Sequence, residues 1–467
     1  MNLAWYALWF VVAVSLLVTV HEFGHFWVAR RLGFKVLRFS VGFGRPILEH
    51  QGKDGTVYAL AMLPLGGYVK LLDEREGPVP TAELARSFTR KPPWQRILVL
   101  LAGPAFNIIF AILVLWGMFL FRGTLEEPRP VIGDVVAESI AGRGGLRSED
   151  LILSVDGAPI ATRSNALFAL LDALTANGRA SLTVKGKDGA SRAVALEVGD
   201  SASRRRLTEP AALFPGLGFQ FWEPSLPSIV GRVEAGTPAD RAGLKVGDQI
   251  VEVNGRPVAD FKDILYVTGT SKPGDELTIR FVRGANDHTV RTVRARLASR
   301  KGPNGQVVGA LGVGSMGAKW PAEMIVTTKL TVTSALSEAA KEAWNMTMLQ
   351  VKLVSRMVTG NVSLKNLSGP LSIAEFAGES ASDGAMSFMN FLVLISLSLG
   401  FLNLLPIPIL DGGQVVFQLV EWLKGSPLSE RAQVFGQQIG IALLILLMGV
   451  ALFNDVTRQI GPQLMGQ

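Results

Sequence analysis

The chain has 467 residues, of which 48% are hydrophobic and 18% are charged, and its formal net charge is +7. This length exceeds one ordinary domain, the apolar content argues against a wholly soluble protein, and the absence of cysteine excludes disulfides and thiolate metal sites. The basic residues are dispersed and form no basic-aromatic stripe, so the charge favours a lipid bilayer as partner and no nucleic acid.

The chain begins with an uncharged apolar stretch that runs directly into the sequence His21-Glu22-Phe23-Gly24-His25. Two His four residues apart share one helix face and can bind one Zn²⁺, and Glu22 can serve as general base. Ionisable groups at membrane depth are costly, so they indicate a functional site. A cleaved signal peptide would need a basic start, which residues 1–20 lack. We therefore expect a retained first span over residues 1–30.

Residues 31–96 predict a cytoplasmic β-hairpin, with strands at 36–44 and 57–63 and a turn at Lys53-Asp54-Gly55. The sequence Gly42-Phe43-Gly44 ends the first strand. The hairpin has two interpretations: an ordinary surface element, or a loop that dips toward the active site and offers an edge strand to an extended substrate. The residues alone favour the surface element.

Three further apolar segments follow, at residues 97–121, 388–405 and 433–454, and each is near the ~20 residues that cross a bilayer. The third span and the broken Asp-Gly motif after it together occupy residues 386–414. Lys and Arg concentrate in the connections between spans one and two and between spans three and four. The positive-inside rule places both connections in the cytoplasm. The long connection between spans two and three, and both termini, would then be periplasmic.

The long outside connection contains an internal repeat, in which Gly145 and Gly157 match Gly243 and Gly255 with one constant offset. Each copy reads as a short helix, a Gly-Leu turn, an alternating strand and an Asp-Gly or Asn-Gly turn. The pattern resembles two tandem α/β PDZ domains, at 126–212 and 213–303, which bind extended peptides or C-termini by strand addition. The alternative is an unrelated pair of small β-rich domains. The segment Gly216-Leu217-Gly218-Phe219 is predicted to open the second domain as a carboxylate-binding loop and strand.

Residues 321–385 are predicted to form an amphipathic helix, over 321–358, and a linker. The helix could lie on the membrane and lead into span three, or it could pack on the PDZ pair. A cytoplasmic helix is expected at residues 415–432, before the fourth span.

Catalytic zinc usually takes three protein ligands and one water, so one ligand must come from outside the His21–His25 run. The third span is interrupted by Pro406 and Pro408. Such a break is tolerated at membrane depth only where it is buried or lines a wet cavity. Asp411 follows the break, where an unpaired carboxylate would be costly but a zinc-bound one would not. We therefore predict Asp411 as the third ligand; the alternative is an Asp that caps the following helix.

These residues predict hydrolysis in which Glu22 takes a proton from water and returns it to the leaving amine. Asn403 is a candidate for stabilising the oxyanion. Two other classes use the same features: a membrane protein that binds or transports metal, and a catalytically inert PDZ scaffold. Glu22 at the position of a general base argues against transport, and the intact His-Glu pattern argues against an inert scaffold.

Together the motifs resemble the site-2 protease family, of the type that regulates sigma-E in Gram-negative bacteria, over essentially the whole chain. The matching sequence motifs are His21–His25, Gly42-Phe43-Gly44, Leu101–Asn107, Asn366–Pro370 and Asn403–Gly412. The resemblance implies an inner-membrane zinc metalloprotease with four transmembrane helices. It also implies second-site cleavage of a transmembrane anti-sigma factor in an envelope stress response, after a first cut outside.

The resemblance further implies that the PDZ pair filters or recruits substrates. It favours a substrate-handling role for Gly42, Phe43 and Gly44, and it makes Asn403, Pro406 and Pro408 candidates for substrate or transition-state support. The chain departs from the family pattern at Ser398 and Gln414, where the family has Asn and His.

Overall fold

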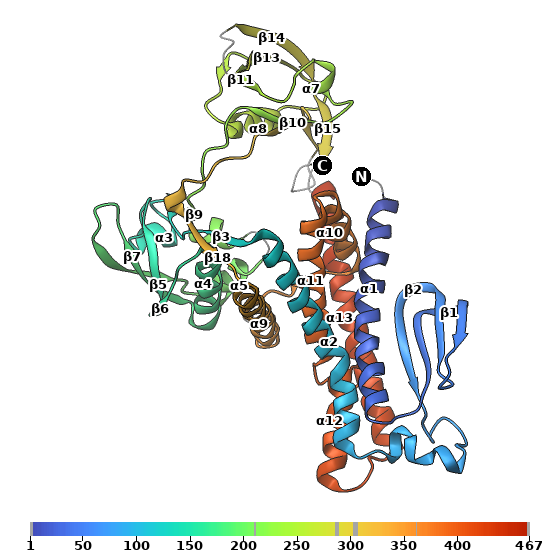
Figure 1. The fold of residues 1–467 in the computed structure, drawn as a ribbon. Helices are drawn as coiled ribbons and strands as arrows, with labels where there is room; N and C mark the ends of the chain where they lie inside the picture. Colours follow the sequence, from blue (N-terminus) through green and yellow to red (C-terminus); the bar gives the residue numbers. More distant parts are fainter. Residues whose placement is uncertain (1–2, 210–211, 285–288, 302–306, 361, 465–467) are drawn as a thin grey trace.

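The computed structural model describes residues 3–209, 212–284, 289–301, 307–360 and 362–464. Within these residues four helices are long and apolar enough to cross a membrane, which agrees with the four predicted spans. They are α1 (Leu3–Arg31), α2 (Pro93–Arg122), α11 (Ala385–Asn403) and α13 (Glu430–Leu464), and they form a helical bundle (Figure 1). Residues 1–2 of the predicted first span lie outside the described residues.

Helix α2 lies between α1 and α11 and packs closely on both. A Cβ added at Gly24 of α1 would come within 2.4 Å of the Ala102 carbonyl oxygen on α2, and one at Gly400 of α11 within 3.0 Å of the Pro104 carbonyl oxygen. Only glycine allows such close backbone approach. The small residues of α1 and α11 thus fix the position of α2 at the centre of the site described below.

The connection between α1 and α2 contains a small sheet made by β1 (Val36–Gln51) and β2 (Val57–Leu71), both longer than predicted. Residues 38–41 of β1 pair with residues 57–60 of β2 and also with residues 67–70, while residues 46–51 pair with 57–61. The first half of β1 therefore lies between the two halves of β2, and residues 67–71 form an edge. Gly42 and Gly44 have φ values of +92° and +88°, which favour glycine where β1 bends. The sheet lies alongside α1 (Figure 1).

The region between α2 and α11 contains two units with the same order of elements. The first has the sheet order β6-β5-β7-β8 and the second has β12-β11-β13-β14. The first comprises β4 (Ile132–Val135), α3 (Ile140–Arg143), β5 (Leu151–Val155), β6 (Ala158–Pro159), α4 (Arg163–Asn177), β7 (Arg179–Lys185), β8 (Ser191–Glu197), α5 (Ser201–Leu207), α6 (Leu213–Leu217) and β9 (Phe219–Phe221). The second comprises β10 (Val230–Val233), α7 (Pro238–Arg241), β11 (Asp248–Val253), β12 (Arg256–Pro257), α8 (Phe261–Thr270), β13 (Glu276–Arg283), β14 (Val290–Arg296), β15 (Ala298–Lys301), β16 (Val307–Ala310) and β17 (Val313–Ser315). Each unit encloses its own hydrophobic core.

The predicted boundary between residues 212 and 213 is wrong. Strand β9 pairs with β4, and Leu217, Phe219 and Phe221 are buried in the core of the first unit. The Gly216–Phe219 segment thus completes the first unit and does not open the second. The second unit likewise continues past the predicted end at residue 303, itself outside the described residues, because β17 pairs with β10.

A two-stranded ribbon joins this region to the bundle. Strand β3 (Thr124–Pro128) follows α2 directly and pairs antiparallel with β18 (Ile325–Lys329), so that Pro128 faces Ile325. The predicted helix from residue 321 therefore begins later, as α9 (Val332–Val358), because the preceding segment forms a short 3-10 turn and β18. The chain enters and leaves the two units at one place.

Helix α9 contacts the first unit, in line with the predicted packing on the PDZ pair, and it also packs on the spans α2 and α11, while its predicted placement on the membrane surface stays a prediction. Its buried Ala335, Ala339 and Ala343 pack with side chains of α2 and α11. Near its C-terminal end, Lys352 Nζ lies 2.6 Å and Arg356 Nη2 lies 2.5 Å from the carboxylate of Asp172 on α4. Ion pairs between α9 and α4 therefore hold the first unit against α9.

Two buried charged contacts join helices within the bundle. Arg96 of α2 makes a bidentate pair with Glu421 of α12 (Asp411–Lys424), at 2.6 and 3.2 Å. Asp455 of α13 is fully buried and accepts hydrogen bonds from the backbone amides of Gly369, Leu371 and Ser372, at the start of α10 (Pro370–Ser382). Both carboxylates are satisfied, as buried charges must be.

Candidate metal centre

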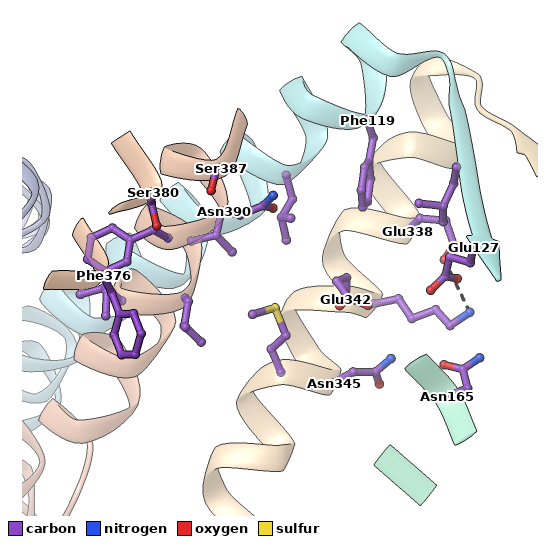
Figure 2. A pocket seen from close by; sticks show the side chains of 18 residues that line it. Phe119, Glu127, Asn165, Glu338, Glu342, Asn345, Phe376, Ser380, Ser387 and Asn390 are labelled. Carbon is purple, nitrogen blue, oxygen red and sulfur yellow. Dashed lines mark ion pairs between the residues drawn. The ribbon is translucent and has the colours of Figure 1, made fainter. Parts of the chain in front are cut away.

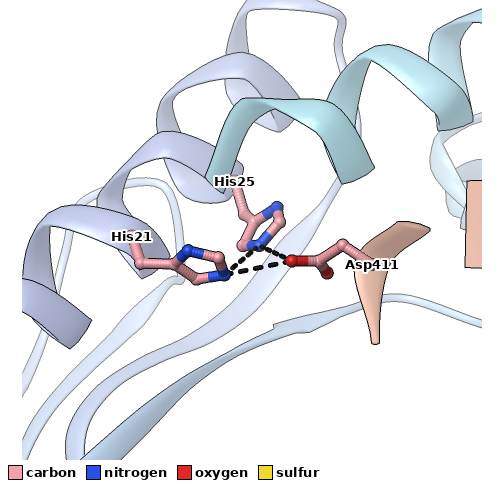
Figure 3. Close-up of side chains that lie close together, drawn as sticks. All are labelled: His21, His25 and Asp411. Atoms are coloured by element: carbon pink, nitrogen blue, oxygen red, sulfur yellow. Dashed lines mark hydrogen bonds and ion pairs between the residues drawn. The ribbon is translucent and has the colours of Figure 1, made fainter. Parts of the chain in front are cut away.

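The structure brings His21, His25 and Asp411 together across 386 residues of chain (Figure 3). His21 Nε2 lies 3.1 Å from His25 Nε2 and 3.1 Å from Asp411 Oδ2, and His25 Nε2 lies 3.5 Å from the same oxygen. His21 is 7% exposed. Within the described part of the chain this is the group of His and carboxylate ligands that could hold a metal ion.

The geometry of these three atoms fits zinc. For zinc–ligand distances of about 2.0–2.1 Å, tetrahedral coordination places ligand atoms roughly 3.3–3.4 Å apart. The three separations between the ligand atoms, from 3.1 to 3.5 Å, bracket that value. Two imidazoles and one carboxylate are also a usual donor set for catalytic zinc, with a fourth position for water.

Helix α2 makes room for the two imidazoles and orients one of them. A Cβ added at Gly103 would lie 2.3 Å from His25 Nε2 and 2.8 Å from His21 Nε2, so this glycine leaves the space that the ligand atoms occupy. One turn earlier, His25 Nδ1 lies 2.7 Å from the Val99 carbonyl oxygen. Because a carbonyl can only accept, Nδ1 must carry the proton and donate it, which leaves the Nε2 lone pair free for a metal.

The broken third span delivers Asp411. Helix α11 ends at Asn403, and Asp411 is the first residue of α12. A Cβ at Gly412 would come within 2.2 Å of the Leu404 carbonyl oxygen, and one at Gly413 within 2.1 Å of the Ile407 carbonyl oxygen. The two glycines thus let α12 start directly against the segment that carries Pro406 and Pro408. Asp411 faces the histidines from this start, as predicted for a ligand.

Glu22 lies beside the edge of the β1–β2 sheet. A Cβ added at Gly67 of β2 would lie 3.2 Å from Glu22 Cγ, and the Glu22 carboxylate faces the backbone amide of Val69. The same carboxylate lies within electrostatic reach of His25, His21 and Asp411. The edge strand, the candidate base and the three ligand residues therefore share one location.

The other candidate residues do not form part of the ligand set. Asn403 is half-buried at the end of α11. Phe43 is 45% exposed, and its ring stacks on that of Tyr68 at 6.3 Å. Gln414, one of the two departures from the family pattern, donates from Nε2 to the Pro408 carbonyl oxygen at 2.7 Å and so braces the broken segment.

A cavity of about 610 Å³ lies elsewhere, between α9 and the spans α2 and α11 (Figure 2). Apolar side chains such as Phe119 line it together with Glu127, Glu338 and Glu342. Burial, with a smaller contribution from the neighbouring carboxylates, raises the pKa of Glu342 above its ordinary value. None of the ligand residues lines this cavity.

Sequence reasoning missed the parts of the site that α2 supplies. Val99 acts through its backbone carbonyl, and Gly103 acts through the absence of a side chain, so neither residue type gives a signal in one sequence. Asn107, two turns after Val99, is a polar residue in the middle of an apolar span and fully buried. Its cost in that position is one signal. The Leu101–Asn107 motif of the family resemblance, which contains it, is a second, but neither indicates a contact with His21.

Comparison with known proteins identifies relatives along nearly the whole chain. The model of peptidase family M50 matches residues 9–447. The regulator of sigma-E protease RseP of Escherichia coli is 37% identical over 453 residues, which cover 96% of this chain and 98% of that protein. A protein of Neisseria meningitidis, named provisionally as a zinc metalloprotease, is 37% identical over 97% of this chain and 99% of its own length. A solved PDZ domain from Listeria monocytogenes covers 21% of this chain and 92% of its own at 19% identity, with a TM-score of 0.16, too low to support an argument.

Proposed function

Because the chain belongs to peptidase family M50, we propose that it cuts a membrane-spanning protein within the bilayer, as the second of two cuts. The chain is a zinc metalloendopeptidase and a multi-pass inner-membrane protein. We take its substrate to be a transmembrane anti-sigma factor that has already been trimmed outside. The observation that carries the proposal is the meeting of His21, His25 and Asp411 with Glu22 beside an edge strand.

His21, His25 and Asp411 would hold the ion. Zinc at this site supplies Lewis-acid chemistry, since it polarises a carbonyl and makes water a better acid. The Asp411 carboxylate balances part of the positive charge, and the α2 contacts keep the imidazoles aimed at one point.

Glu22 acts as the proton carrier. Its carboxylate takes a proton from the attacking water as the carbon–oxygen bond forms. The same group then gives that proton to the leaving nitrogen as the peptide bond breaks. Asn403, with its amide N–H, would donate to the oxyanion.

The substrate must be extended where it is cut, because a helix hides its carbonyl groups inside its own hydrogen bonds. Residues 67–71 of β2 would pair with this extended stretch by strand addition. Gly42, Phe43 and Gly44 at the bend of β1 would guide it, and Pro406 and Pro408 would keep the opposite wall non-helical. Substrates with helix-weakening residues near the cut should be preferred.

The two outside units act as PDZ domains that bind a peptide or a C-terminus and thereby filter or recruit substrates. The groove lined by Arg163, Leu167, Phe214 and Phe221, between α4 and β9, supports this role in the first unit. Both units and both chain termini would be periplasmic, and the zinc site would lie near the cytoplasmic side.

The test uses purified full-length protein and a model transmembrane peptide. Glu22→Gln should lower the cleavage rate by about 10²–10⁴-fold, because the base is lost, while bound zinc stays at the wild-type level. Glu49→Gln, on the exposed part of β1, is the matched control and should cleave normally. Cleavage by Glu22→Gln at the wild-type rate, or cleavage unaffected by a zinc chelator, would overturn the proposal.

A further inference from the structure

We propose that Asn107 is a positioning residue for His21: in the metal-loaded protein its amide oxygen accepts the Nδ1 proton of His21 and so frees the Nε2 lone pair for the ion. The inference rests on the proposed metal site. It assigns a role to a side chain that lies outside the ligand set and contacts neither substrate nor ion.

Asn107 occupies a position that is costly for a polar side chain. The side chain is fully buried within α2, where an amide is costly unless it is hydrogen-bonded. One of its amide atoms, Nδ2, lies 3.2 Å from His21 Nδ1, while Oδ1 is buried and has no partner among the described residues. The contact with His21 is therefore the interaction that can justify this residue here.

A metal ion bound by His21 requires a free lone pair on Nε2. If the amide nitrogen donates to Nδ1, the ring proton must sit on Nε2, and Nε2 then has no lone pair for an ion. If the amide turns by half a rotation, Oδ1 accepts from Nδ1–H and Nε2 becomes free. Either orientation of the Asn107 amide leaves one of its two polar atoms without a protein partner. Metal binding therefore selects the orientation in which Oδ1 accepts the proton of His21 Nδ1.

His25, the other imidazole of the site, is also oriented by an acceptor on α2. That ring already has an obligatory acceptor, the Val99 carbonyl oxygen, at 2.7 Å. Val99, Gly103 and Asn107 are spaced by four residues and share one face of α2, just as His21 and His25 share one face of α1. The face of α2 thus orients both imidazoles from its two ends and leaves space for them in the middle.

Contacts with α11 prevent Asn107 from moving away from His21. Ser396 Oγ of α11 donates to the Asn107 backbone carbonyl oxygen at 2.8 Å. A Cβ added at Gly400 would lie 3.4 Å from Asn107 Cβ, so α11 presses directly against this residue. The third span therefore holds the amide against His21.

Two substitutions separate the hydrogen bond from mere space-filling. Asn107→Leu keeps the volume but removes the acceptor, and it should weaken zinc binding about 10–100-fold, the usual effect of losing such a support. Asn107→Asp keeps an acceptor and should bind zinc at least as tightly as the wild type. Ser398→Ala is the control: it removes a bond within α11, from Ser398 Oγ to the Leu394 carbonyl oxygen, that does not involve Asn107, and it should leave zinc affinity near the wild-type value.

The measurements are zinc affinity, by competition with a chelator on the full-length protein, and nitrogen NMR of ¹⁵N-labelled histidine. The chain has four His, so few signals need assignment. Zinc-loaded wild type should show both His21 and His25 protonated at Nδ1, and Asn107→Leu should disturb His21 alone. Wild-type zinc affinity in Asn107→Leu, or a loss as large in Asn107→Asp, would overturn the inference while leaving the protease intact. A wild-type protein that binds no zinc would overturn both.

Discussion

Gly103 gives the sharpest test of how the zinc site is built. In Gly103→Ala the new methyl group would lie 2.3 Å from His25 Nε2 and 2.8 Å from His21 Nε2, whereas ordinary contact begins near 3.4 Å. The His25 ring must therefore retreat by roughly 1 Å, the scale of misplacement that can cost about 100-fold in rate, or roughly 2.7 kcal/mol. Because both ligand atoms are displaced, bound zinc should fall together with activity.

The assay is zinc content and peptide cleavage of the purified variant. Gly117→Ala in the same helix is the control, because a Cβ at Gly117 would meet nothing within 4 Å. It should keep wild-type zinc and wild-type cleavage. Full zinc occupancy and unchanged cleavage in Gly103→Ala would refute the reasoning that α2 shapes the site.

Three further outcomes are expected. Asp411→Ala should leave purified protein with substantially reduced zinc by metal analysis; full occupancy would remove it from the ligand set. Glu421→Gln leaves Arg96 buried without its partner and should cost about 3 kcal/mol of stability. Removing both charges should cost less than Glu421→Gln alone, and thermal unfolding that gave the reverse order would contradict this. Burial raises the pKa of Asp172, but the paired Lys and Arg of α9 outweigh it and hold that pKa below its ordinary value. Docking of the first unit should therefore be fully present at neutral pH and be lost as acid protonates Asp172, and Asp172→Asn should loosen it at pH 7; hydrogen exchange in α4 that stayed unchanged in both cases would speak against this contact.

The spans were predictable because hydropathy is a property of consecutive residues. The position of Asp411 beside the histidines was predictable by a different route, since one ligand was missing and a costly carboxylate followed a broken span. That reasoning used the chemistry of the residues and no knowledge of the fold. An expensive residue type in an apolar segment thus carries more information than its neighbours, and the ligand role of Asp411 stays a prediction.

The failures share one cause, which is that pairing partners lie far apart in the chain. The Gly216–Phe219 segment looked like the start of a domain, yet its strand pairs with β4, some 85 residues earlier. The late start of α9 depends on the pairing of β18 with β3, about 200 residues away. The double pairing of β1 depends on bends at Gly42 and Gly44 that leave no distinct pattern. Local patterns predict elements, and only the fold decides which elements meet.

The β3–β18 ribbon has a consequence for how such a chain could be assembled. Because Pro128 faces Ile325, everything between these two residues enters and leaves through neighbouring points, the geometry that tolerates insertion of one domain into another. We expect that the segment can be excised and replaced by a tight turn without stretching α2 or α9. The membrane-spanning protease and the two inserted units would then be separable parts, open to exchange between one protease and the next.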